Sequence, residues 1–135
     1  MKKILSCLIS IMIIMAMFTM NVHSALPGAL SPMWDVLSTI EINVNFVGGD
    51  GTAIANITGV YGYTNQIDAI MIVYQEVDGE LIYIDSTGGS AETALRLRVD
   101  FDAESGATYV AEVIVTAYSS EGSETETISD TNTCP

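Results

Sequence analysis

Hydrophobic and polar residues alternate with a period of two from Ser38 onward, and glycine-rich turns interrupt the alternation about every 8–12 residues. Such a pattern is typical of an all-β sandwich or barrel, because successive side chains of a strand point to opposite faces. The alternation predicts seven short strands, over residues 39–46, 52–61, 67–76, 80–85, 94–101, 108–118 and 124–129. We therefore expect one antiparallel β-sandwich domain spanning residues 38–129.

Two of the predicted strands are apolar on both faces. In TYVAEVIVTAY, residues 108–118, one face is the expected core face and carries Tyr109, Ala111, Val113, Val115 and Ala117. The other face carries Val110, Ile114 and Tyr118, interrupted by Glu112 and Thr116, and residues 67–76 repeat this feature with Ile70, Ile72 and Tyr74. A half-exposed strand needs only one apolar face, so the second face requires a separate explanation.

The segment FDAESGATYVAEVIVTAYSSEG, residues 101–122, resembles the late part of a fibronectin type III or immunoglobulin-like β-sandwich. The resemblance implies that Tyr109 is a tyrosine corner whose hydroxyl returns to the backbone near residues 102–104. It also implies that strand 67–76 lies beside strand 108–118, in one sheet that strands 80–85 and 124–129 complete. The chain departs from the pattern because Trp34 precedes the first strand and no inter-sheet cystine is available.

A second likeness concerns the wider layout. The stretch SPMW before the first strand, and the Gly-x-x-Tyr start of strand 108–118 ahead of a Glu- and Thr-rich last strand, are similar to small secreted Gram-positive bacterial proteins of unknown function. That likeness implies no activity.

The first residues have the layout of a bacterial secretory signal peptide. Lys2 and Lys3 precede an apolar run from Ile4 to Met20, and Val22 and Ser24 suit cleavage after Ser24. A retained membrane anchor is the alternative, since the run approaches the length that spans a bilayer. We expect cleavage of residues 1–24, an extracellular protein without stable membrane insertion, and an irregular apolar leader over residues 25–37.

The charge balance beyond residue 24 restricts the partners. All 17 acidic residues remain, whereas Arg96 and Arg98 are the only permanent cations. Such a chain repels phosphate backbones and anionic lipids, so we expect no nucleic-acid binding and no docking to a membrane surface. Basic proteins, cations and neutral sugars remain compatible, and solubility outside the cell explains the acidity equally well.

Cys134 is the only cysteine beyond residue 24. It follows a polar run, so we expect residues 130–135 to form a flexible tail with an accessible thiol. An unpaired cysteine in a secreted chain suggests a free thiol or an intermolecular disulfide, which here would link two copies.

Little catalytic chemistry is available to the mature chain. The only histidine, His23, leaves with the signal peptide, and no lysine remains, which excludes histidine-based nucleophilic catalysis, histidine- or cysteine-based zinc sites, and Schiff bases. Carboxylates remain, and Asp100, Asp102 and Glu104 alternate into a loop like the start of a calcium-binding loop, although Gly106 is one place late. Solvation of a strand end is the simpler interpretation, and we expect no enzyme and no cofactor other than this calcium hypothesis.

The second apolar face is the main candidate for function. If strands 67–76 and 108–118 are neighbours, they form a patch of large side chains, with part of residues 80–85 alongside: Ile70, Ile72, Tyr74, Val110, Ile114 and Tyr118. A monomer rarely leaves such a patch uncovered. The sequence leaves open three ways of covering this patch: the leader, a second copy of the chain, or an external protein or sugar. We expect a non-catalytic binding module, and the alternative is a structural subunit of a homo-oligomer or extracellular matrix.

Overall fold

Seven strands make up the part of the chain that the computed structural model describes, residues 35–135. They are β1 (Leu37–Val47), β2 (Asp50–Gly59), β3 (Thr64–Val77), β4 (Glu80–Ala91), β5 (Ala94–Asp102), β6 (Thr108–Ser119) and β7 (Ser123–Thr133). Within this range no helix occurs, and therefore none with the length and hydropathy needed to cross a bilayer. The expected all-β class is confirmed. The signal peptide predicted over residues 1–24, and the leader up to residue 34, lie outside the described residues.

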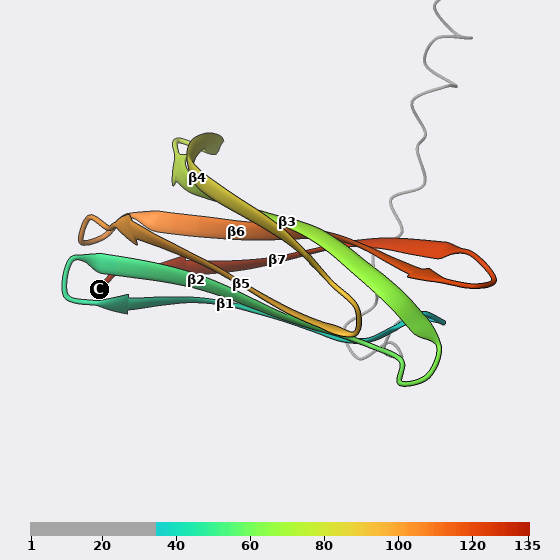
Figure 1. Ribbon diagram of the computed structural model, residues 1–135. Helices are drawn as coiled ribbons and strands as arrows, with labels where there is room; N and C mark the ends of the chain where they lie inside the picture. The colour runs from blue at the N-terminus through green and yellow to red at the C-terminus, as the bar shows by residue number, and fades with distance from the viewer. Residues whose placement is uncertain (1–34) are drawn as a thin grey trace, which may run out of the picture. The chain divides into compact units, whose positions relative to one another are not determined.

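The strands form two antiparallel sheets that lie one over the other (Figure 1). One sheet has three strands in the order β1-β2-β5, and the other has four in the order β4-β3-β6-β7. Consecutive strands β2 and β3 belong to different sheets, as do β4 and β5 and also β5 and β6. The result is a sandwich-like domain with an outer face on each sheet.

The core lies between the two sheets and follows the predicted alternation. In β6 every second residue from Tyr109 to Ala117 is buried, and the intervening residues are partly exposed. Three rings meet at one end of the core, where Phe101 and Tyr109 have centroids 4.9 Å apart and Phe46 lies 5.6 Å from Tyr109. The core-facing assignment of β6 is therefore confirmed.

β4 is longer than predicted. We expected its strand to end at residue 85 and a loop of small residues to follow, whereas pairing with β3 continues to Ala91, opposite Ile67. Gly, Ser and Thr are typical of loops, but β3 is 14 residues long and offers its edge to them. Small residues also allow close packing, since a Cβ on Gly89 would lie 3.2 Å from the Leu95 side chain.

The expected flexible tail over residues 130–135 does not hold. β7 continues to Thr133, and its side chains on the inner face bind the edge of β1. Glu124 Oε2 accepts hydrogen bonds from the N–H groups of Val36 and Leu37, at 3.0 and 3.2 Å. Asp130 Oδ2 accepts one from the Val44 N–H at 2.9 Å. The polar composition suggested a frayed end. It gave no sign that Glu124 and Asp130 accept hydrogen bonds from backbone N–H groups of another strand.

Candidate functional site

The six apolar residues predicted to share a surface lie on the outer face of the four-stranded sheet. β3 and β6 are hydrogen-bonded neighbours, and Ile70 lies directly opposite Ile114 in their register. Tyr74 lies opposite Val110 in the same way. Glu112 faces Ile72, and Asp68 faces Thr116 between the Ile70–Ile114 pair and Tyr118, so two carboxylates interrupt the apolar surface. We call this set the outer patch: Ile70, Ile72, Tyr74, Val110, Ile114 and Tyr118.

The outer patch is only partly covered by its own sheet. Ile70 and Tyr118 are 42% and 39% exposed, and the other four side chains are half-buried. Ile70 is open because its neighbour on β4 is Gly88, which has no side chain to lie over it. A shallow hollow of about 270 Å³ lies here, lined by Asp68, Ala69, Ile70, Gly89, Ile114 and Thr116.

The β3–β4 hairpin extends the apolar surface. Its turn has positive φ at Asp78 (53°) and Gly79 (82°), as a type I′ hairpin turn requires and as an Asp-Gly pair favours. Four side chains flanking the turn are between 39% and 58% exposed, and we call them the hairpin tip: Val77, Leu81, Ile82 and Tyr83. Figure 1 shows this hairpin leaving the layered part of the domain.

A bulge sets which residues of β4 join the outer patch. The register between β3 and β4 shifts after Val73, so Ile84 has no direct partner and Tyr83 lies opposite Tyr74. Tyr83 therefore continues the row that Tyr74 and Val110 begin. The sequence predicted that residues 80–85 lie near the patch. It gave no clear signal of the bulge, which determines which of these side chains point to the outer face.

The outer face of this sheet carries carboxylates and no cation. No lysine or arginine occurs in β3, β4, β6 or β7, whereas Asp68, Glu76 and Glu112 lie on the outer face. Hydrogen bonds from Ser90 and Gln66 lower the pKa of Asp68 below its ordinary value of 3.8. Asp68 is therefore ionised at neutral pH, and the face is negative as well as apolar.

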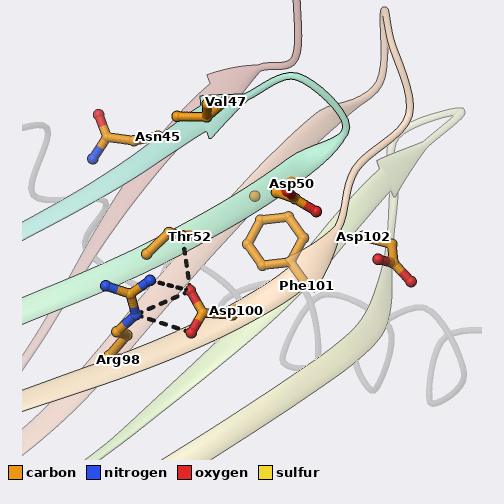
Figure 2. A pocket seen from close by; sticks show the side chains of 9 residues that line it. Asn45, Val47, Asp50, Thr52, Arg98, Asp100, Phe101 and Asp102 are labelled. Carbon is orange, nitrogen blue, oxygen red and sulfur yellow. Dashed lines mark hydrogen bonds and ion pairs between the residues drawn. The ribbon is translucent and has the colours of Figure 1, made fainter.

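The residues of the calcium hypothesis do not come together. Figure 2 shows the Asp100 carboxylate turned to Arg98 and Thr52, with Asp102 lying apart from it. The Arg98–Asp100 ion pair, 2.7 Å long, lowers the pKa of Asp100, and the Thr52 hydroxyl adds to this effect. Among residues 35–135 there is no group of three His, Cys, Asp or Glu side chains that would hold a metal ion.

The hollow in Figure 2 lies on the three-stranded sheet and has a mixed polar and apolar lining. It has a volume of about 570 Å³ and lies beside the β1–β2 turn, with Arg98 and Asp100 on its wall. Since those two side chains neutralise each other, neither is available as an isolated charge for a ligand. The hollow brings together no reactive pair of residues.

Tyr109 holds the loop before its own strand. Its ring is buried, and its hydroxyl accepts a hydrogen bond from the backbone N–H of Glu104 at 2.9 Å. Glu104 thus contributes its backbone to a turn. The hydroxyl returns to the backbone within the range that the fold resemblance implied.

Cys134 is buried rather than accessible. Only 2% of its surface is exposed, and its N–H donates to the Ala107 carbonyl at 2.9 Å. Its own carbonyl accepts a hydrogen bond from Gly106 at 2.8 Å. These bonds dock the residue on the β5–β6 loop, so the expected exposed thiol, and the easy disulfide link between copies, do not fit this fold.

Comparison with known proteins adds no identity to this description. No protein-family model and no curated protein matches the chain.

Proposed function

We propose that the chain is a secreted, fibronectin type III-like binding module that holds a protein partner on the outer patch. The strand order supports the fold part of this proposal, because β4-β3-β6-β7 opposite β1-β2-β5 is the arrangement that the resemblance implies. The Tyr109 hydroxyl bonded to the Glu104 backbone supports it further. Secretion rests on the signal-peptide pattern of residues 1–24.

The observation that carries the proposal is the run of partly exposed apolar side chains from Ile70 and Ile114 to Tyr83. β4, β3 and β6 are adjacent strands, and β6 has 12 residues. Such a face is about 40 Å long and ~14 Å wide, which is on the order of 600 Å² before side-chain relief is included. Specific interfaces bury about 800 Å² per partner, so the face has a suitable size for one protein contact.

The residue types of the patch also suit a protein interface. Tyrosine combines a large apolar ring with a hydroxyl that tolerates water, and it is enriched at the energetic centres of interfaces. Tyr74, Tyr83 and Tyr118 give this face three such side chains, and Ile70 lies among them. The structural-subunit alternative loses one of its supports, since Cys134 is buried.

Site-specific photo-crosslinking tests the proposal. A photoreactive amino acid replaces Ile70 or Tyr118 on the outer patch, and Ile54, on the outer face of the other sheet, serves as the matched position. The protein is irradiated in its source cells and their medium, and the adducts are identified by mass spectrometry. We expect one discrete protein adduct from positions 70 and 118 and none from position 54.

Two outcomes would contradict the proposal. Equal adducts from all three positions would show unspecific contact, and the absence of any adduct from positions 70 and 118 would leave the patch without a protein partner. An adduct of the chain with itself would favour the homo-oligomer instead.

A further inference from the structure

The hairpin tip is apolar on both of its faces, which distinguishes it from the rest of the sheet. Tyr83 and Leu81 lie opposite Tyr74 and Glu76 on the outer face. Ile82 and Val77 belong to the other face, which in the body of the domain is the core face. They remain exposed because the hairpin continues past the layered region (Figure 1). Water therefore reaches four large side chains around a single turn.

The same hairpin carries only negative charge. Glu76, Asp78, Glu80 and Asp85 lie within ten residues of one another, and the four-stranded sheet has no lysine or arginine. An apolar site ringed by one sign of charge selects a partner of the opposite sign, because a like-charged surface is repelled during encounter and in the complex.

A second copy of the chain fits this surface poorly. Packing two hairpins together would bring their carboxylates into proximity. Both arginines of the described range lie on β5 in the other sheet, and Arg98 is already paired with Asp100 at 2.7 Å. Arg96 is the one remaining cation of the described range, so self-association could place at most one unpaired arginine per copy against the several carboxylates of the hairpin.

We infer that the hairpin tip docks a cationic, amphipathic polypeptide segment. Apolar side chains of the segment pack against Leu81 and Tyr83, and its lysine or arginine side chains lie near Glu76 and Glu80. This inference rests on the proposed binding function and names the chemistry of the partner. The site adjoins the outer patch at Tyr83 but does not include Ile70 or Tyr118, so substitutions at those positions test the two sites separately.

The first test measures the binding of a fluorescently labelled, synthetic helix-forming peptide of leucine and lysine by anisotropy. A peptide with glutamate in place of lysine is the charge control. We expect the lysine peptide to bind at least about tenfold more tightly. Raising the salt from about 50 to about 500 mM should weaken this binding, since salt screens surface charge.

Matched variants separate the hairpin tip from general electrostatics. Leu81→Ser with Tyr83→Ser should lower the affinity about tenfold or more, whereas Ile54→Ser on the other sheet should leave it unchanged. Glu76→Gln with Glu80→Gln should weaken binding more than Glu41→Gln with Glu104→Gln, which removes the same charge elsewhere. All four carboxylates are exposed, so folding should tolerate these changes.

Three results would overturn the inference. Equal losses of affinity in the two double variants, at positions 76 and 80 and at positions 41 and 104, would show that net charge alone attracts the peptide. Loss on Ile70→Ser with none on Leu81→Ser and Tyr83→Ser would move the site to the outer patch, which leaves the proposed function intact. Dimerisation that disappears on Leu81→Ser with Tyr83→Ser, seen by sedimentation velocity, would make a second copy the occupant.

Discussion

Gly51 shows how a single residue without a side chain positions the aromatic end of the core. It lies opposite Phe46 on β1 and Phe101 on β5, and the Phe101 ring occupies the space above it. The Phe46 and Phe101 rings form an edge-to-face pair, with centroids 6.3 Å apart and an interplanar angle of 90°. A glycine between two cross-strand aromatic residues thus lets both rings stay in the core and contact Tyr109.

We predict that Gly51→Ala destabilises the domain. A Cβ at this position would overlap the Phe101 ring, so the ring must move out of its packing with Tyr109. Overpacking of this kind costs about 1–3 kcal/mol, measurable as a lower midpoint of urea unfolding.

Gly49→Ala is the matched control for this prediction. Its Cβ would meet only the Ala103 carbonyl oxygen at 3.7 Å, an ordinary contact, and its backbone φ is not in the left-handed region. Equal midpoints for the two variants would show that the Phe101 ring moves away from a Cβ at position 51 without a cost in stability.

The sequence predicted which residues of a strand point into the core, but not which residues they contact there. Period-two alternation is a local property, so it is enough to predict that Tyr109 and Val113 are core residues. The contact of Gly51 with Phe101 joins residues 50 positions apart and depends on register, which the sequence does not specify. The hydroxyl bond of Tyr109 was predictable only through the fold resemblance.

At the scale of elements, β7 closes one side of the sandwich. β1 is an edge strand, and an edge leaves backbone N–H and C=O groups without strand partners. Glu124 and Asp130 accept from three such N–H groups, and Asn132 Nδ2 donates to the Val44 carbonyl at 2.8 Å. Polar side chains of one sheet thus complete the hydrogen bonding of the other.

We predict that Asp130→Ala destabilises the domain by about 1–3 kcal/mol, since it leaves the partly buried Val44 N–H without its acceptor. Asp130→Asn keeps an acceptor oxygen and should recover much of the loss. Glu126→Ala, on the same strand, removes the same charge and should change stability by less than about 0.5 kcal/mol.

Thermal unfolding of the three variants measures these differences in stability. Equal losses for Asp130→Ala and Glu126→Ala would contradict the role given to the bond between Asp130 and the Val44 N–H.

The elements that sequence reasoning missed share one physical cause. Residues 86–91 of β4 and 130–133 of β7 are small or polar, so composition indicated loop and tail. Each is nevertheless a strand because a longer neighbour, β3 or β6, offers it a hydrogen-bonding edge. Strand formation at an edge depends on the neighbouring strand more than on intrinsic preference.

At the scale of the whole molecule, the two outer faces have different characters. The three-stranded sheet holds both arginines of the described range, whereas the four-stranded sheet holds the outer patch and only acidic charge. The sequence predicted the six residues of the patch because two strands read as apolar on both sides. The hairpin tip needed the structure, since its exposure depends on how far β3 and β4 extend beyond the core.

The last prediction concerns the end of the sandwich where three distant segments meet. Cys134 is bonded to the loop between β5 and β6, and its Sγ lies 3.9 Å from the Gly48 carbonyl oxygen in the β1–β2 turn. A reagent reaches this thiol only when that end of the domain opens. In a Cys7→Ser background, we expect Ellman's reagent to react with Cys134 slowly in the native protein and at once in denaturant, because native thiol reactivity follows exposure.

Val47→Cys in the same background provides the matched exposed thiol, since Val47 is exposed near the same turn. It should add one rapidly reacting group while Cys134 stays slow. If Cys134 reacts as fast as the thiol at position 47, the end of β7 opens freely in solution and a disulfide between copies regains its structural basis. If it stays slow, a covalent dimer through Cys134 requires partial unfolding of this end of the domain.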